Sequence, residues 1–339
     1  MGYSLSKDQF DSLLDALKES YTVYGPAVDP DKGSYSDTDR ITYKRISCLD
    51  DLVLDQKTYF SPKEIVYPVR EPLFHFSEGS FSVPDIDGKK IAILLRPCDI
   101  NGFDRLDTIF LKNGPEEDFY YKRRRENIRF FMIECTEGFD SCWCVSMNAN
   151  KTDMYDVAFR FGSEIMADVK NEEFASYFSG VTEADVDIQF IEKNLVEVKV
   201  PEIGSISPES FDYGMWDEYT SRCIACGRCN TSCITCSCFT MQDVAFGTEG
   251  RMAERRRRWA GCQLNGFTDM AGGHTYRPKH GEKMRFKTMH KINDFHRRFG
   301  KHQCVGCGRC DDVCPQYISF ARCINTLSAA VAERGKNEQ

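Results

Sequence analysis

The sequence predicts an α+β or α/β domain over residues 1–205, followed by a mainly α-helical domain over residues 206–339. Two short apolar runs, Lys90–Leu95 and Ile128–Ile133, indicate buried strands in the first domain. Residues 101–111 between them carry apolar side chains at helical spacing and complete a strand–helix–strand unit. Such a unit favours parallel pairing of its strands, which is typical of α/β and α+β domains.

A change of composition near residue 205 supports the division into two domains. Residues 201–209 are rich in Pro, Gly and Ser, and the chain becomes dense in cysteine beyond them. Residues 319–334 then predict a last helix. A chain of 339 residues can bury one large core and support a smaller module, as this division requires.

The other elements expected in the first domain are shorter. Ser6 and Gln9 have the spacing of a capping box, which predicts the start of a helix. The apolar residues that follow at helical spacing are Phe10, Leu13, Leu14 and Leu17. Residues 34–87 contain several prolines and predict short strands and loops. Residues 188–192 and 196–200 predict a late β-hairpin.

Cysteine is the most unusual feature of the composition, with 17 residues in the chain. The sequence shows neither the basic and apolar leader of secreted proteins nor an apolar run long enough to cross a membrane. We therefore expect a cytoplasmic protein without membrane insertion. In such a reducing compartment, crowded thiols bind metal more often than they form disulfides.

One cysteine motif, C-x2-C-x2-C-x3-C, occurs twice in the second domain. The first copy is Cys223, Cys226, Cys229 and Cys233, and the second copy is Cys304, Cys307, Cys310 and Cys314, followed by Pro315. This spacing lets one tight loop hold three corners of a [4Fe–4S] cubane. The repeat therefore predicts a ferredoxin-like domain with two [4Fe–4S] clusters and a long insert, residues 234–303, between the two cluster motifs.

The ferredoxin pattern also assigns each motif cysteine to one cluster, because the fourth cysteine of each motif ligates the other cluster in two-cluster ferredoxins. Cluster 1 takes Cys223, Cys226, Cys229 and Cys314, and cluster 2 takes Cys304, Cys307, Cys310 and Cys233. Zinc is the alternative metal, but structural zinc sites usually combine two separated C-x2-C pairs.

Four cysteines of the first domain form a candidate third site. They are Cys98, Cys135, Cys142 and Cys144. Cys98 follows the first predicted strand and the other three follow the second, so parallel neighbouring strands would gather them at the carboxyl edge of the sheet. We expect a third [4Fe–4S] cluster there. The alternative is a set of buried, inert thiols.

A weaker candidate for a fourth site lies in the insert. It consists of Cys236, Cys238 and Cys262, with His274 nearby. Three cysteines and one histidine can hold an iron–sulfur cluster or zinc. The alternative is that these side chains line the ferredoxin module without binding metal. The two cysteines left over, Cys48 and Cys323, are interpreted as structural.

Charge and motifs argue against several classes of function. The formal net charge of −8 argues against nucleic-acid binding. The basic segment 254–259, Glu-Arg-Arg-Arg-Arg-Trp, is interpreted as a solvated helix face, or as an arginine patch that offsets the charge of nearby clusters. No dinucleotide-binding or P-loop glycine motif is present, so the chain has no recognisable site for nicotinamide, flavin or ATP. Clusters without such a site indicate an electron carrier with no catalytic residue of its own.

Six further segments give the sequence a family resemblance that runs nearly from end to end. They are residues 36–39, 43–47, 96–101, 142–147, 150–153 and 269–274, besides the two cluster loops. On these residues the chain resembles the iron–sulfur electron-transfer subunit of anaerobic sulfite reductases and, more distantly, the beta subunit of cytoplasmic sulfhydrogenases. Residues 36–39 and 269–274 favour the sulfite reductase branch.

The resemblance implies an electron-transfer subunit of a dissimilatory-type anaerobic sulfite reductase complex. A flavin-containing subunit would oxidise NADH, this chain would relay the electrons through its clusters, and a sirohaem subunit would reduce sulfite to sulfide. The alternative is the iron–sulfur beta subunit of a cytoplasmic nickel–iron hydrogenase or sulfhydrogenase. Two further hypotheses are a catalytic sirohaem subunit, whose cysteine spacing would overlap Cys304, Cys310 and Cys314, and a zinc protein or iron–sulfur regulator without an electron-transfer role.

Overall fold

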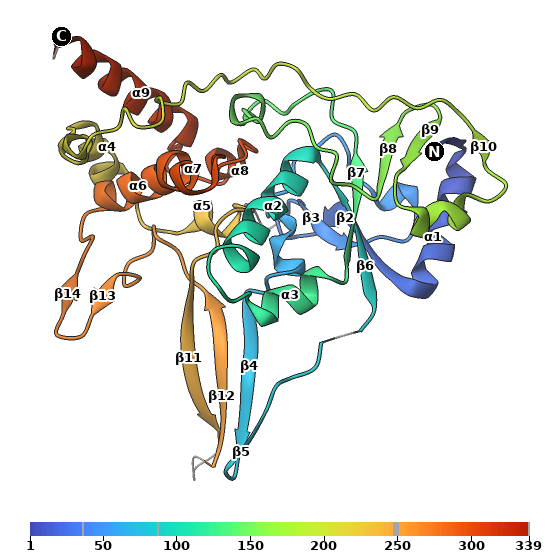
Figure 1. Cartoon of the computed structure of the whole chain (residues 1–339), viewed down its shortest axis with the longest axis horizontal. Coiled ribbons are helices and arrows are strands. Elements are labelled where there is room, and N and C mark those ends of the chain that lie inside the picture. Colours follow the sequence, from blue (N-terminus) through green and yellow to red (C-terminus); the bar gives the residue numbers. More distant parts are fainter. Residues whose placement is uncertain (36, 87, 247–250, 338–339) are drawn as a thin grey trace.

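The computed structural model describes residues 1–35, 37–86, 88–246 and 251–337. At its centre is a mixed eight-stranded sheet with the strand order β10-β1-β9-β8-β7-β6-β2-β3 (Figure 1). The strands are β1 (Gly2–Leu5), β2 (Tyr21–Asp29), β3 (Arg40–Arg45), β6 (Lys90–Leu95), β7 (Ile128–Ile133), β8 (Val157–Phe161), β9 (Ile165–Val169) and β10 (Thr182–Glu183). Strands β2, β6, β7 and β8 pair in parallel, so the predicted parallel pairing of β6 with β7 is confirmed.

Helices cover both faces of this sheet. Helix α1 (Lys7–Ser20) begins at the predicted capping box of Ser6 and Gln9 and buries its apolar residues against one face. Helices α2 (Pro97–Leu111) and α3 (Phe119–Arg125) pack on the other face. Helix α2 begins before residue 101, where it was predicted to begin, because Pro97 suits the first helical position.

Neighbouring residues of the central strands belong to two different cores, as the alternation of a strand requires. In β6, Ala92 and Leu94 face the α1 core, whereas Ile93 and Leu95 face the α2 core. The α2 core continues into the C-terminal part of the chain, where Phe320 packs into it. The sheet and the cysteine-rich region therefore share one apolar core.

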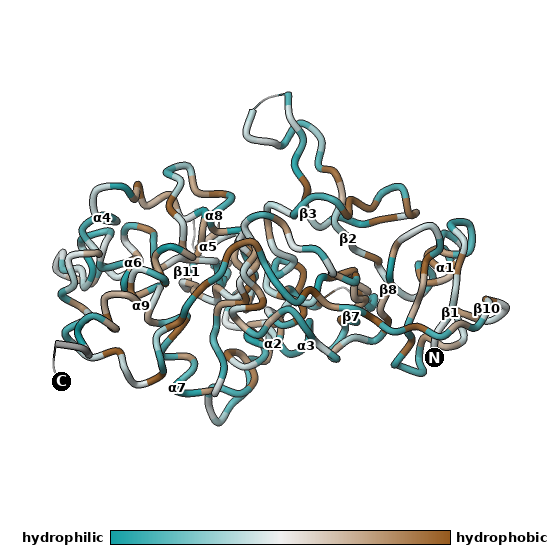
Figure 2. The backbone as a smooth tube through the Cα atoms, turned by 90° about the horizontal axis from the view of Figure 1, so that it is seen from above, coloured by the Kyte–Doolittle hydropathy of each residue, from teal (hydrophilic) through white to brown (hydrophobic). Residues whose placement is uncertain are grey.

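The helices after residue 205 lie at one end of the molecule, and α1, β1 and β10 lie at the other end (Figure 2). In chain order they are the 3-10 helix η5 (Pro208–Asp212), α4 (Met215–Arg222), α5 (Arg228–Thr231), α6 (His280–Met289), the π-helical turn η6 (His290–Asp294), α7 (Phe295–Phe299), α8 (Arg309–Asp312) and α9 (Phe320–Asn337). Helix α9 was predicted from the sequence. No helix in the described residues is long and apolar enough to cross a membrane.

A second sheet projects from the molecule and corrects the prediction of a mainly helical second domain (Figure 1). Its strands, in the order β11-β12-β4-β5, are β11 (Phe239–Phe246), β12 (Met252–Trp259), β4 (Arg70–Ser77) and β5 (Ser80–Ser82), and a separate hairpin consists of β13 (Asp269–Met270) and β14 (His274–Thr275). The insert thus contributes four strands. Because β4 comes from the first 205 residues and β12 from the insert, this sheet joins the two predicted domains. The division at residue 205 itself stays a prediction.

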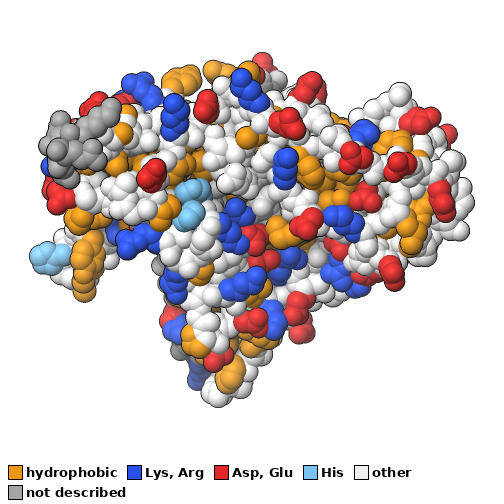
Figure 3. All heavy atoms as spheres, turned by 45° about the horizontal axis from the view of Figure 1, so that its top comes forward, with side chains coloured by type: hydrophobic (Ala, Val, Ile, Leu, Met, Phe, Trp, Pro, Cys, Tyr) orange, Lys and Arg blue, Asp and Glu red, His pale blue; other side chains and the backbone are white. Residues whose placement is uncertain are grey.

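The interpretation of residues 254–259 as a helix face is wrong, because they belong to strand β12. A β-bulge between Arg255 and Arg256 interrupts the alternation of the strand, so Arg257 is buried, at 1% exposed, whereas Arg255, two residues before it, is exposed. The guanidinium of Arg257 pairs with Glu71 at 2.8 Å and with Asp118 at 2.7 Å. On the face shown in Figure 3, positive, negative and apolar side chains are mixed over the projecting sheet.

The predicted hairpin of residues 188–192 and 196–200 is also wrong. Each half pairs with another part of the chain. Phe190 forms an isolated parallel bridge with Cys135, and the Val198 amide donates to Ser146 Oγ at 3.0 Å. The segment therefore covers the loops that follow β7 instead of folding on itself. Ser36, which contributes to the family resemblance, lies outside the described residues.

Candidate iron–sulfur centres

One cavity, here called cavity A, brings together the four cysteines predicted for cluster 1. Cys223 ends α4, Cys226 and Cys229 belong to the loop and helix α5 that follow, and Cys314 comes just after α8. Residues from α6 and α9 close the cavity, among them Lys287. The predicted ligands of cluster 1 therefore surround one space, although two distant segments supply them.

A second cavity, cavity B, brings together the four cysteines predicted for cluster 2, which are Cys233, Cys304, Cys307 and Cys310. Two of the cysteines, Cys229 and Cys310, line both cavities, as does the side chain of Lys287. The two cavities therefore adjoin one another. Helices α5 and α8, which lie within the two repeated motifs and carry Cys229 and Cys310, contact each other.

The loops around these cavities depend on glycine. Gly227 and Gly308 precede α5 and α8 with φ of 72° and 76°, in the left-handed region that favours glycine. At Gly308, a Cβ atom would lie 2.1 Å from the carbonyl oxygen of Ser141. This close approach seats the second cluster loop directly on the segment that carries Cys142 and Cys144.

Backbone amides point at several of the motif sulfurs. The amide of Ala225 donates to Cys223 Sγ at 3.4 Å, and the amide of Gly306 donates to Cys304 Sγ at the same distance. Ile318 donates in the same way to Cys314 Sγ at 3.3 Å. Hydrogen bonds of this kind favour the thiolate form that ligates iron and influence the potential of a bound cluster. The donor set therefore fits an iron–sulfur cluster in each cavity.

Without a bound metal, burial favours the protonated form of several of these thiols. It raises the pKa of Cys307 to about 12 and also raises the pKa values of Cys229, Cys304 and Cys310. Iron would therefore displace protons when it binds. Within the described residues, no three His, Cys, Asp or Glu side chains are arranged to hold a single metal ion. The cysteines surround cavities instead.

Two buried lysines stand beside the cysteines, and sequence reasoning did not single them out. Lys287 lines cavities A and B, and Lys291 lines cavity B. Burial lowers the pKa of Lys287, but the nearby thiols, with Cys229 first among them, outweigh this effect and raise the pKa well above its usual value. The signal in the sequence was their i, i+4 spacing, but such pairs more often lie on a solvated helix face.

The candidate third site is assembled at the carboxyl edge of the central sheet. Cys98 lies in the first turn of α2, directly after β6, and Cys135 follows β7. Burial, and next the neighbouring Cys142, raise the pKa of Cys144 to about 12, with a further contribution from Cys135. Cys142 Sγ also lies 3.7 Å from the carbonyl oxygen of Cys307, at cavity B. Burial, then Asp99 and next Cys144, raise the pKa of Cys98 well above its usual value, so Cys98 lies near this group of thiols. The binding of a cluster by the four cysteines stays a prediction.

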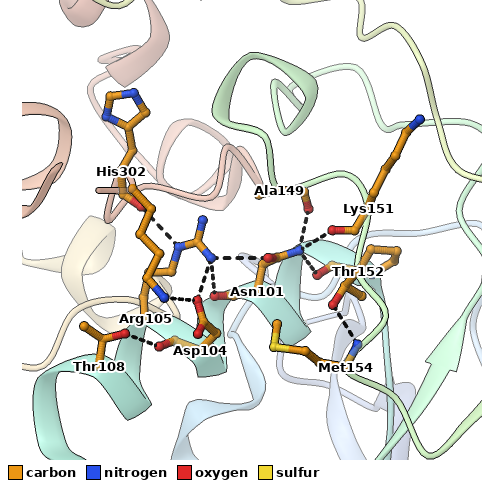
Figure 4. A network of polar contacts seen from close by, with 11 residues as sticks. Asn101, Asp104, Arg105, Thr108, Ala149, Lys151, Thr152, Met154 and His302 are labelled. Atoms are coloured by element: carbon orange, nitrogen blue, oxygen red, sulfur yellow. Dashed lines mark hydrogen bonds and ion pairs between the residues drawn. The ribbon is translucent and has the colours of Figure 1, made fainter. Parts of the chain in front are cut away.

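A polar network on α2 holds the surrounding loops in place (Figure 4). Asn101 Nδ2 donates to the carbonyl oxygens of Ala149 at 3.3 Å and Lys151 at 2.9 Å, in the segment after Cys144. Arg105 Nε donates to the carbonyl oxygen of His302 at 3.1 Å, just before Cys304. Both side chains are buried, so α2 connects the loop of the candidate third site to the loop of cavity B.

A third cavity, cavity C, is lined by Cys236, Cys238 and Cys262 of the candidate fourth site. His274 is not among the residues that line it. This histidine is exposed on β14, in the hairpin that projects from the molecule, so its inclusion in the site is corrected. His290, at the start of η6, lines the cavity instead. The sequence alone does not show that His290 rather than His274 lies at these cysteines, because spacing along the chain does not decide which histidine the fold brings to the cavity.

Comparison with known proteins agrees with this geometry. Residues 222–318 match the family model described as a 4Fe-4S dicluster domain, a range that holds both repeated motifs. Over 95% of its length, the chain is 30% identical to the sulfhydrogenase 2 subunit beta of Pyrococcus furiosus, of which 97% is covered. No solved structure matches the chain. The chain carries a dicluster domain that supports multiple [4Fe–4S] clusters, and it belongs to the family of sulfhydrogenase beta subunits.

Proposed function

We propose that this chain relays electrons between partner subunits of a cytoplasmic oxidoreductase complex. The observation that carries the proposal is the contiguity of cavities A and B, which share Cys229 and Cys310. Bound [4Fe–4S] clusters supply one-electron redox chemistry. Cavity A opens towards the surface near the exposed Cys226, whereas Cys304 and Cys307 of cavity B are buried. Cavity A therefore lies nearer the surface, and cavity B lies in the interior of the protein.

The four cysteines at the sheet edge extend this path. We assign a third cluster to Cys98, Cys135, Cys142 and Cys144. The loop with Cys142 lies directly on the second cluster loop, where the amide of Trp143 donates to the carbonyl oxygen of Gly306 at 2.8 Å. An electron can therefore pass from cavity A through cavity B to the carboxyl edge of the sheet without leaving the protein.

The chain's own side chains contribute charge and shielding. Each cluster with four thiolates is anionic, and the buried ammonium groups of Lys287 and Lys291 offset that charge inside the protein. The backbone amides of Ala225, Gly306 and Ile318 orient the sulfurs. The apolar wall contributed by Phe320 keeps water away from both cavities.

For the identity of the complex, a hydrogenase-type assembly is better supported than a sulfite reductase. The end-to-end similarity to a sulfhydrogenase beta subunit favours the alternative predicted from the sequence, in which this chain is the iron–sulfur beta subunit of a nickel–iron hydrogenase or sulfhydrogenase. The sulfite reductase assignment is the second candidate. It rests on the resemblance of residues 36–39 and 269–274, of which the second segment lies in the hairpin β13–β14. It requires an NADH-oxidising flavin subunit and a sirohaem subunit as partners.

Purification of the intact complex without oxygen distinguishes the two candidates. We expect nickel and hydrogen-dependent reduction of the clusters in the hydrogenase-type complex. Sirohaem absorbance and NADH-dependent reduction of sulfite to sulfide would instead establish the second candidate. If the purified chain held fewer than about eight iron and eight sulfide atoms, the number in two four-iron clusters, the relay itself would be refuted.

A further inference from the structure

We propose that cavity C holds an additional iron–sulfur cluster of the four-iron class, ligated by Cys236, Cys238, Cys262 and His290. This inference extends the proposed relay and does not depend on which enzyme the complex contains. The four side chains come from three segments, which are residues 236–238 after the first cluster motif, Cys262 after β12, and His290 at the junction of α6 and η6. They surround a space instead of meeting at a point, which suits a multi-atom cluster better than a single ion.

The sulfur atoms of cavity C are close neighbours. Cys236, Cys238 and Cys262 line cavity C together, and the amide of Cys236 donates to the carbonyl oxygen of Cys233, which lines cavity B, at 3.4 Å. The cysteines of cavity C therefore adjoin those of cavity B. A cluster in cavity C would lie beside cluster 2, because Lys287 and Lys291 line both cavities.

A buried amide points at two of these sulfurs. Asn230, which is 2% exposed, donates through Nδ2 to Cys236 Sγ at 3.5 Å and to Cys262 Sγ at 3.4 Å. Its Oδ1 accepts a hydrogen bond from the amide of Gln263 at 3.2 Å, which fixes the orientation of the side chain. Sulfur accepts a hydrogen bond well as a thiolate, so a buried amide committed to two sulfurs favours the thiolate form, which is the form that ligates iron.

The sequence leaves room for this contact. Gly261 precedes Cys262, and a Cβ atom at this position would lie 2.9 Å from Oδ1 of Asn230. A side chain at residue 261 would therefore push the amide away from the sulfurs. Gly261 does not have a positive φ, so only the lack of space for a side chain requires glycine at this position.

Positive charge surrounds the cavity without carboxylates to balance it. Lys287 and Lys291 are each 3% exposed and line the cavity, and Lys63 Nζ donates to the carbonyl oxygens of Asn230 and Cys236. Within the described residues, none of these lysines forms an ion pair with Asp or Glu. Buried charge without a counter-charge is unfavourable, and an anionic set of thiolates and cluster would supply that counter-charge.

The π-helical turn η6 adds a structural reason for the place of His290. Such turns insert one residue into a helix and often occur at functional sites. Here the turn begins at His290 itself, and Lys291 donates to Thr235 Oγ1 at 2.8 Å on the opposite wall. The turn thus presents an imidazole and an ammonium group to the same cavity.

The test uses the full chain, purified in its complex without oxygen. In the variant Cys262→Ala we expect the loss of about four iron and four sulfide atoms, the content of one four-iron cluster, with the signals of the ferredoxin pair retained. The matched control is Cys48→Ala, which removes a cysteine that lines none of the three cavities. Unchanged iron and sulfide in Cys262→Ala, or the loss of one zinc ion instead, would overturn the proposal.

A second measurement does not depend on the folding of a variant. With ¹⁵N-labelled histidine in the otherwise unchanged chain, pulsed EPR of the reduced protein should show a nitrogen coupled to a cluster. The coupling should vanish in His290→Ala and persist in His274→Ala. The absence of any histidine coupling in the unchanged chain would refute the proposed ligand set. If the proposed relay function were wrong, the signals of the ferredoxin pair would themselves be missing. Failure of the cavity C proposal would leave those signals in place.

Discussion

The guanidinium group of Arg309 forms a two-point ion pair with the carboxylate of Asp99, with N–O distances of 2.6 and 2.8 Å. Both side chains are buried, and Thr58 and Tyr43 complete their hydrogen bonds. Arg309 belongs to the second cluster motif, whereas Asp99 directly follows Cys98 of the candidate third site. The ion pair therefore holds two cysteine-bearing segments together across the core.

We predict that Asp99→Asn destabilises the protein by about 3 kcal/mol or more, because it leaves the buried guanidinium of Arg309 without a counter-charge. Anaerobic urea unfolding of the cluster-loaded chain measures this change. The control is Asp50→Asn, which breaks an exposed pair with Lys7 and should cost less than about 1 kcal/mol. Equal effects of the two substitutions would contradict a structural role for the buried pair.

The substitution Lys287→Gln should lower the reduction potentials of the clusters in both cavities A and B, because a positive charge stabilises the more negative reduced state. An interaction of about 1.4 kcal/mol corresponds to ~59 mV for one electron, so we expect a change on the order of 50 mV or more. EPR-monitored redox titration measures it. The variant Lys279→Gln, at the exposed start of α6, should leave both potentials unchanged. A shift confined to one cluster would show that Lys287 is not shared.

The variant Cys307→Ser should lose one four-iron cluster and stop electron delivery, while the central sheet stays folded. The reason is that Cys307 lines cavity B alone, and the α1 core contains no residue from the cluster loops. Iron and sulfide analysis measures the loss of the cluster, and circular dichroism shows whether the sheet stays folded. An assay of electron transfer between the partner subunits measures electron delivery. Unaltered electron transfer in this variant would rule out the relay assignment.

The variant Gly308→Ala should lose the cluster of cavity B, because its Cβ atom would lie 2.1 Å from the Ser141 carbonyl oxygen, at a φ of 76°. Gly79→Ala is the matched control. Gly79 has a similar φ of 85° but open space around it within the described structure, so only the backbone strain of about 1–2 kcal/mol applies. Iron content should fall by about four atoms in the first variant and stay constant in the second. If both variants kept their iron, close packing of the loop on residue 141 would not matter for the cluster.

Much of the fold followed from local patterns. The capping box at Ser6, the apolar runs of β6 and β7, and the last helix all occur where the sequence places them. The predictions that failed concern segments whose partners are distant in sequence. The arginine run of β12 was taken for a helix because charge alone has no period, and its strand character depends on pairing with β4. The segment around Phe190 pairs with the end of β7 instead of with itself.

The sequence by itself determined the two cluster motifs, since three cysteines in one tight loop are a local property that needs no tertiary partner. It also determined the exchange of Cys233 and Cys314 between the cavities, because the repeat carries that pattern. Only the tertiary structure decided that Lys287 stands between cavities A and B, and that His290 rather than His274 faces cavity C. A side chain reaches such a place through the packing of whole helices, which the spacing of residues along the chain does not specify.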